Sequence, residues 1–350
     1  MYIKGVMKKE RIHLGKEIYN RKNRKIQTGV NKRNKIETKR KYIRTGVFDI
    51  RQNNENNISI HNSIKDRNVS QWDRNVSPKD RNVSTLDKNF LQSSTARNLI
   101  STSKLEISKN SIVIEIGAGE GQLTFPISQI AKTVYAVEID KKLAEKLKKK
   151  VNEKQIGNIK VQEDDILKIK VTEKVYTLIG NIPFSITSKI FDRFTLSERI
   201  LPQHMYFLME LPAYKKYSST RCLAGILTGT YFESNILRNV NRKFFHPVPN
   251  SSICFADFSL RKNPLIPYNL KQDYIYFVKY FYNAGNRTIG NTLNKLLTIK
   301  ESTIYLHEFH KIHKRKIENL KLTDMNIEDW VMFFKFFYPI CFKKIYRNRK

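Results

Sequence analysis

The 350-residue sequence carries 65 Lys and Arg against 32 Asp and Glu, so its formal net charge is +33 at pH 7. A chain that is 40% hydrophobic can bury a core, and this excess of positive charge indicates a polyanionic partner. Nucleic acid is the first candidate and a membrane surface is the alternative. No apolar run is long enough for a transmembrane helix. Three scattered cysteines, Cys222, Cys254 and Cys341, exclude a disulfide framework and fit a reducing, cytoplasmic environment.

Residues 1–85 form a basic, polar extension with little apolar periodicity. We expect it to be disordered, either as an arm that adds phosphate contacts or as a solvated tail without a role. Inside it the pattern Asp-Arg-Asn-Val-Ser recurs every seven residues, beginning at Asp66, Asp73 and Asp80. One apolar residue in seven is too few for a coiled-coil seam. We therefore interpret residues 66–84 as a spacer made by tandem duplication.

The chain is organised around residues 113–123, where an apolar run ends at Gly117, Gly119 and Gly121 and a helical pattern begins. A sharp turn without Cβ atoms allows a ligand to lie against the backbone, and a nucleotide-like ligand is the natural occupant. The spacing Gly-x-Gly-x-Gly is tighter than the dinucleotide fingerprint Gly-x-Gly-x-x-Gly. A plain tight turn is therefore the alternative interpretation.

A second apolar strand, residues 133–139, ends in Glu138 and Asp140, about twenty residues after the glycines. Doubly wound sheets place an acid there to accept hydrogen bonds from ribose hydroxyls. No Lys or Arg follows the glycines closely, and we expect Glu120 to repel a pyrophosphate. S-adenosylmethionine fits this pattern, because its sulfonium and ammonium groups tolerate nearby acids.

A third strand, residues 159–162, is followed by Glu163, Asp164 and Asp165. A carboxylate at that position can accept a hydrogen bond from the exocyclic amine of an adenine. An ordinary solvated loop acid has the same sequence signature. The choice between the two depends on the next strand.

The strand at 175–180 ends in Asn181, Ile182, Pro183 and Phe184. This sequence supplies a side-chain amide oxygen, a carbonyl that precedes a proline, and a flat ring. The lone pair of adenine N6 is delocalised into its ring, so the two N6 hydrogens must be held by acceptors for the lone pair to reach a methyl donor. We expect the Asn181 side chain and the Ile182 carbonyl to hold N6. Phe184 would stack on the flipped base.

The elements alternate as expected for an α/β protein with a mostly parallel sheet. Helices are expected at 94–104, 122–130, 141–150 and 186–194, the last with Ser185 as N-cap, and strands at 111–116, 133–139, 159–162, 175–180 and 205–210. Further strands are expected at 209–212 and 253–260, the second within an antiparallel hairpin. The glycine turn, Glu138, Asp165 and Asn181 all fall at carboxyl ends of strands, where such sheets bind ligands.

From about residue 263 the pattern becomes helical, with helices expected at 274–282, 289–297, 303–313 and 327–337. The aromatic clusters at 333–338 are interpreted as core rather than as base-stacking platforms. The repeated histidines His307, His310 and His313 lie among lysines and indicate a basic helix face rather than a metal site, and no metal is expected. The basic C-terminal residues fit RNA contacts and a solvated tail equally well.

Several of these segments, in this order, resemble motifs of the rRNA adenine N6-dimethyltransferases. This family contains the erythromycin-resistance methylases and the KsgA-type small-subunit enzymes. The resemblance runs from about Lys88 to near the C-terminus, through stretches at 89–91, 115–121, 138, 165–167, 181–184 and 245–249. The chain departs from the usual motifs at Lys88, where Gln is usual, and at Phe184, where Tyr is commoner. It also lacks the usual Lys-Val after Pro249.

The resemblance implies a class I S-adenosylmethionine-dependent methyltransferase, with a Rossmann-like catalytic domain at 86–262 and a small helical RNA-binding domain at 263–350. It implies cofactor-binding residues Asn89, Leu91, Gly117, Gly119, Glu138, Asp165 and Asn181. It implies catalytic residues Asn181, Ile182, Pro183, Phe184 and Phe245, the last covering the second face of the target base. Transfer would be direct, from the sulfonium to N6.

The form Phe-His-Pro-x-Pro at 245–249 and the closing segment at 327–337 resemble the large-subunit branch. A Gln-Lys-Glu pattern associated with the other branch is absent near Glu210. We therefore expect methylation of 23S rRNA, which would confer macrolide-lincosamide-streptogramin B resistance, by a monomer without membrane attachment. The alternatives are a KsgA-type small-subunit enzyme and a non-catalytic nucleic-acid-binding relative of the mitochondrial transcription factor B type.

Overall fold

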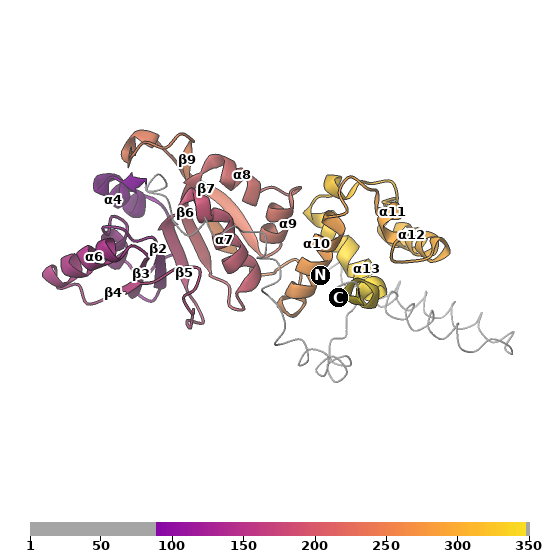
Figure 1. Ribbon diagram of the computed structural model, residues 1–350, viewed down its shortest axis with the longest axis horizontal. Coiled ribbons are helices and arrows are strands. Elements are labelled where there is room, and N and C mark those ends of the chain that lie inside the picture. The colour runs from indigo at the N-terminus through magenta and orange to yellow at the C-terminus, as the bar shows by residue number, and fades with distance from the viewer. Residues whose placement is uncertain (1–88, 348–350) are drawn as a thin grey trace, which may run out of the picture. The chain divides into compact units, whose positions relative to one another are not determined.

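The computed structural model describes residues 89–347, so the N-terminal extension and its repeats lie outside the described residues. Its centre is a seven-stranded sheet in the order β4-β3-β2-β5-β6-β9-β7 (Figure 1). The strands are β2 (Ile112–Ile116), β3 (Thr133–Glu138), β4 (Ile159–Glu163), β5 (Thr177–Asn181), β6 (His204–Glu210), β7 (Phe232–Val240) and β9 (Ile253–Leu260). The five neighbouring strands β4, β3, β2, β5 and β6 are parallel to one another. Strand β9 is antiparallel to both β6 and β7. The expected α/β fold with a mostly parallel sheet is confirmed.

Helices accompany the strands along the chain. They are α4 (Ser93–Thr102), α5 (Thr124–Ser128), α6 (Lys141–Glu153), α7 (Thr187–Phe191), α8 (Leu211–Tyr217) and α9 (Leu223–Gly229). Helix α6 shows why the sequence folds this way. The Asp140 side chain accepts hydrogen bonds from the backbone N–H groups of Lys142 and Leu143, and so caps the helix. Ala144, Leu147 and Val151 are its buried residues, on one face.

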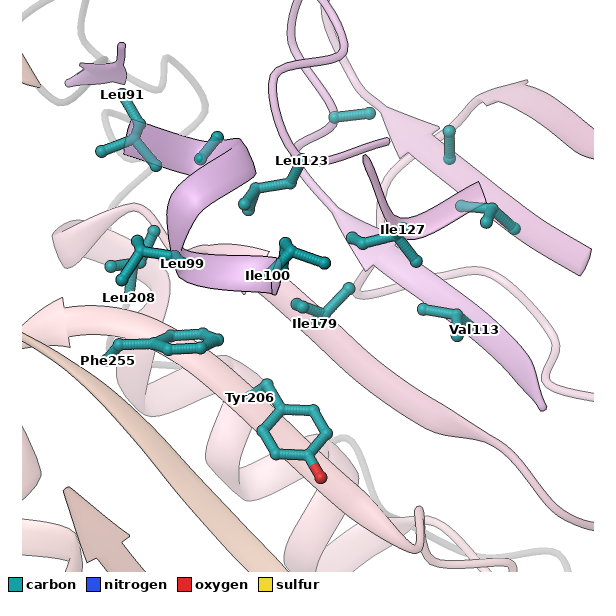
Figure 2. Close-up of a cluster of buried hydrophobic side chains, with 14 of the residues drawn as sticks. Leu91, Leu99, Ile100, Val113, Leu123, Ile127, Ile179, Tyr206, Leu208 and Phe255 are labelled. Atoms are coloured by element: carbon teal, nitrogen blue, oxygen red, sulfur yellow. The ribbon is translucent and has the colours of Figure 1, made fainter. Parts of the chain in front are cut away.

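One hydrophobic core is formed by one face of α4 and the central strands (Figure 2). Leu99 and Ile100 of α4 point toward the strands that carry Ile179, Leu208 and Phe255 (Figure 2). The central strands β2, β5 and β6 are mostly apolar and buried on both faces, as expected where a parallel sheet is covered on both sides. This packing holds the carboxyl ends of the strands in fixed positions.

Two details of the sequence-based expectation are wrong. Leu211 and Pro212 begin helix α8 instead of extending a strand. A proline is tolerated in the first turn because the N–H groups there have no partner within the helix. Ser185 does not cap a helix: it lies inside a 3₁₀ turn, Phe184–Ile186, which leads into α7. The expectation missed α8, α9 and β7, and also a two-residue pairing of β1 (Phe90–Leu91) with β8 (Phe245–His246).

The last helices are α10 (Lys271–Tyr282), α11 (Ile289–Leu293), α12 (Ile299–His313) and α13 (Ile327–Arg347). Aromatic side chains of α10 and α13 pack together, with ring centroids 5.2 Å apart for Phe277 and Phe333 and 5.1 Å apart for Tyr274 and Phe334. The rings at 333, 334, 336, 337 and 338 are buried, so the interpretation as core is confirmed. Within residues 89–347, none of the helices has the length and apolar character needed to cross a membrane.

Candidate active site

A cavity of about 360 Å³ opens at the carboxyl ends of β2, β3 and β5. Ten of the eleven site residues expected from sequence line it: Asn89, Leu91, Gly117, Gly119, Glu138, Asp165, Asn181, Ile182, Pro183 and Phe184. They come from five separate stretches of the chain and are brought together by the strand order. Phe245, the eleventh, does not line the cavity.

The glycine turn after β2 lies against the carboxylate that ends β3. Gly117 and Gly119 have φ angles of 66° and 56°, in the left-handed region that favours glycine. The Gly119 N–H donates to Glu138 Oε2 at 2.8 Å, and the Asp140 N–H donates to Glu138 Oε1 at 2.9 Å. Each carboxylate oxygen keeps a second lone pair. Glu138 therefore fixes the turn and can still accept hydrogen bonds from two ribose hydroxyls.

Two other acids near the turn have different surroundings. Asp165 lines the cavity, accepts from the Leu167 N–H at 2.9 Å and lies 3.6 Å from Lys168 Nζ. Glu120, expected to repel a pyrophosphate, instead pairs with Lys150 at 2.9 Å, and this hydrogen bond lowers the pKa of Glu120. Glu120 does not line the cavity, and its carboxylate lies beside Lys146 and Lys150. Repulsion of a pyrophosphate by Glu120 stays a prediction.

Glu115 is a cavity residue that the sequence reasoning missed. It lies in the middle of the buried strand β2 with 1% of its surface exposed, and its Oε2 has no hydrogen-bond partner among the described residues. Burial raises the pKa of the Glu115 carboxyl to about 8, opposed by a hydrogen bond with Thr124 and increased by the nearby charge of Glu138. The available signal was an acid within an otherwise apolar strand. Its unpartnered oxygen is therefore available for a hydrogen bond beside the cavity.

Replacing Glu115 by Gln is expected to stabilise the protein more at high pH than at low pH. The Glu115 carboxyl titrates at 4.5 in an unperturbed state and near 8 in the fold, so between these values the folded chain holds a proton that the unfolded chain has lost. The free energy of unfolding therefore falls as pH rises across this window, and the Gln variant lacks this loss. Urea unfolding of both proteins at pH 5 and pH 8.5 measures the difference, and a gap independent of pH would contradict it.

Asn181 is oriented by a contact from a distant part of the chain. Its Nδ2 donates to the Asn89 carbonyl oxygen at 2.5 Å. Because that carbonyl can only accept, the nitrogen must face it and Oδ1 must point elsewhere. No described residue donates to Oδ1. The amide oxygen is therefore available as an acceptor in the cavity.

The residues after Asn181 form a rigid turn that carries Phe184. The Ile182 N–H donates to the Leu208 carbonyl at 3.1 Å, which ties the turn to β6. The Thr187 hydroxyl donates to the Pro183 carbonyl at 3.1 Å. Phe184 remains half-buried at the cavity wall. Its ring is thus placed by the backbone and free on the cavity side.

Phe245 does not occupy the position expected for it. In β8 it pairs in register with Leu91, and its side chain is 3% exposed within the core cluster. The neighbouring Phe244 is the exposed ring, at 41%, and its carbonyl accepts from the Gln92 N–H at 2.9 Å. The β1–β8 pairing decides which of the two adjacent rings faces inward. Phe245 is therefore buried outside the cavity in this structure, and its role in covering the target base stays a prediction.

The two phenylalanines give a matched test of which ring is packed in the core. Phe245→Ala is expected to lower the free energy of unfolding by about 3–5 kcal/mol, because it removes a fully packed ring. Phe244→Ala is expected to lower it by about 1 kcal/mol or less, because Phe244 is 41% exposed and loses much less buried area. Urea unfolding of both variants measures the difference. Equal losses would show that Phe244 is packed as tightly as Phe245.

The cavity residues fit S-adenosylmethionine, a cationic nucleoside. Glu138 suits its ribose and Asp165 its adenine. No group of three or more His, Cys, Asp or Glu side chains within residues 89–347 could hold a metal ion. The sheet order, the glycine turn and the acid at the end of β3 define a class I S-adenosylmethionine-dependent methyltransferase.

The family model of the ribosomal RNA adenine dimethylases matches residues 79–337. The chain belongs to this family, and is an S-adenosylmethionine-dependent rRNA adenine N6-methyltransferase.

Two kinds of relatives match the chain. The ribosomal RNA small subunit methyltransferase A of Mycoplasma capricolum is 26% identical over 247 residues, covering 67% of this chain and 90% of that protein. The rRNA adenine N-6-methyltransferase of Limosilactobacillus reuteri is 31% identical over 152 residues, covering 43% of this chain and 61% of that protein.

Two solved structures share the fold over most of the described chain. The 23S rRNA methyltransferase ErmE matches with a TM-score of 0.58 at 23% identity, covering 71% of this chain and 99% of that one. A dimethyladenosine transferase from Plasmodium falciparum matches with a TM-score of 0.57 at 17% identity, covering 72% and 98%. At these identities the two structures establish the fold.

Proposed function

We propose that this enzyme methylates N6 of an adenosine in large-subunit, 23S rRNA, with macrolide-lincosamide-streptogramin B resistance as the consequence. The observation that best supports methyl transfer to N6 is the fixed orientation of Asn181, whose Oδ1 is left as an acceptor. The form Phe-His-Pro-x-Pro at 245–249 supports the large-subunit branch, because it resembles the motif of that branch.

The cofactor, when bound, supplies a methyl group on a sulfonium. Asn181 Oδ1 and the Ile182 carbonyl accept the two N6 hydrogens of the target adenine. With both hydrogens held, the N6 lone pair turns out of conjugation with the ring and toward the cofactor side of the cavity. The Phe184 ring stacks on the flipped base and keeps it in that orientation.

A small-subunit target is the second candidate. The Mycoplasma capricolum enzyme, named for the small subunit, matches this chain over 90% of its own length, whereas the Limosilactobacillus reuteri match covers 61% of that enzyme. Both candidates require the same cavity chemistry and differ in the RNA that is presented to it.

The test is transfer of labelled methyl from S-adenosylmethionine to protein-free large-subunit rRNA and, in parallel, to small ribosomal subunits. Label in adenine N6 of the large-subunit RNA alone is the expected result. Label in the small subunit alone would replace the large-subunit proposal with the second candidate. Absence of label from both, with cofactor binding intact, would contradict methylation of either RNA.

A further inference from the structure

Lys189 is a positively charged residue at a cavity whose other charged residues are mostly acids. It belongs to α7 and lines the same cavity as Asn181 and Phe184, with its side chain exposed. The cavity's other lysine, Lys168, lies 3.6 Å from Asp165 Oδ2. Lys189 pairs with no carboxylate in residues 89–347. Its charge is therefore available to a ligand that enters from outside.

Helix α7 is anchored so that Lys189 stays at the cavity. Ile190 and Phe191 are fully buried, and the Thr187 hydroxyl bonds to the preceding turn at Pro183. Ile186 and Lys189 are three residues apart on the helical turn, so they lie on one side, and both line the cavity. Because the backbone is fixed, only the four-carbon stem of the lysine can move.

The position of Lys189 along the chain indicates which ligand it meets. Glu138 and Asp165, which suit the cofactor, follow β3 and β4, whereas Lys189 follows β5 in the same segment as Asn181 and Phe184. It thus lies on the side where the target base would enter. A base that is flipped into a pocket stays attached to its ribose, and the flanking phosphates stay with the RNA backbone at the mouth. Lysine binds phosphate as a compact point charge.

We infer that Lys189 binds a backbone phosphate of the target nucleotide and thereby positions the adenine against Asn181 and Phe184. The inference rests on the proposed function, because it requires an RNA substrate in this cavity. It adds to that function a contact that is independent of the base sequence. The carboxylate of the cofactor is the competing ligand, and the experiment separates the two.

The experiment compares the full-length protein with Lys189→Ala, Lys189→Arg and a matched control, Lys174→Ala. Lys174 is an exposed lysine that precedes β5, at the opposite edge of the sheet from the cavity. For each protein, the RNA affinity is measured by filter binding from 50 to 300 mM KCl, and KM and kcat for methyl transfer at one salt concentration. The Kd for S-adenosylmethionine is measured by calorimetry.

Lys189→Ala is expected to raise the KM for RNA about 5- to 20-fold and to make the slope of log K against log salt shallower by about 0.7 to 0.9, the loss of one phosphate contact. Its Kd for S-adenosylmethionine is expected to stay within about 2-fold of the parent value, since the contact is to RNA. Lys189→Arg is expected to restore the slope, and Lys174→Ala to leave all values unchanged. A merely structural role for Lys189 would not change the salt slope.

Two outcomes overturn the inference. An unchanged KM and salt slope in Lys189→Ala would show that no phosphate is bound there. A weaker Kd for S-adenosylmethionine with an unchanged salt slope would assign Lys189 to the cofactor carboxylate. Failure of the parent protein to methylate either RNA is a different result, because it contradicts the proposed function itself.

Discussion

Asn181→Ala is expected to lower kcat for methyl transfer by about 100- to 1,000-fold, as does loss of a positioned hydrogen-bonding group in other enzymes. The Kd for S-adenosylmethionine is expected to change little, because the residues that suit the cofactor lie on other strands. The physical reason is that Oδ1 is held in place by donation from Nδ2 to the Asn89 carbonyl. Single-turnover transfer at saturating RNA and calorimetric cofactor binding measure the two quantities.

Two further variants make this result specific. Asn239→Ala removes an exposed asparagine on the edge strand β7 and is expected to leave kcat unchanged. Asn181→Asp keeps an oxygen acceptor but replaces the nitrogen that donates to Asn89, so it is also expected to be poorly active. Full activity of Asn181→Asp would show that donation to Asn89 does not position the side chain. Equal losses of kcat and cofactor affinity in Asn181→Ala would move this residue to the cofactor side.

Most of the cavity could be predicted from the sequence because its residues follow strands. Parallel strands bring their carboxyl ends to one edge, so Gly117, Glu138 and Asn181 meet although they are far apart in the chain. The apolar runs that identify those strands are strong local signals. Once the strands are known, the rules for connecting parallel strands allow only a few strand orders, and each order places the residues that end the strands.

Other features depend on contacts that no local pattern contains. The burial of Phe245 rather than Phe244 is decided by the pairing of β8 with Leu91, more than 150 residues earlier. The orientation of Asn181 depends on Asn89, 92 residues away. Adjacent phenylalanines have the same local propensity, and an asparagine side chain has no preferred partner until the fold provides one. A motif therefore places such residues near the site but does not give their contacts.

Glu115 and helix α8 show a second kind of limit. A glutamate within an apolar strand has the same sequence signature whether its neighbours cover it or leave it open, so its burial and raised pKa appear only in the packed sheet. The proline at the start of α8 is compatible with an edge strand as well as with a first helical turn. In both cases the local sequence is compatible with two structures, buried or exposed for Glu115 and strand or helix for the proline segment. Tertiary packing decides between them.

Glu138→Ala is expected to raise the Kd for S-adenosylmethionine about 100-fold while kcat at saturating cofactor changes only a few-fold. Each charge-assisted hydrogen bond contributes about 1.5–3 kcal/mol, and a hundredfold change corresponds to about 2.8 kcal/mol. Two effects add in this variant. The ribose hydroxyls lose their acceptor, and the Gly119 and Asp140 N–H groups lose the carboxylate that holds the glycine turn. Calorimetric titration with the cofactor measures the Kd directly.

Glu163→Ala is the matched control for Glu138. Glu163 ends the neighbouring strand β4, pairs in register with Glu138 and is exposed outside the cavity, where it lies 3.8 Å from Lys148. Because it has the same charge at the same edge, it reports what a general loss of negative charge does to binding. Its Kd is expected to stay within about 2-fold of the parent value, as for an exposed ion pair. If both variants weakened binding equally, charge alone and not the contacts of Glu138 would explain cofactor affinity.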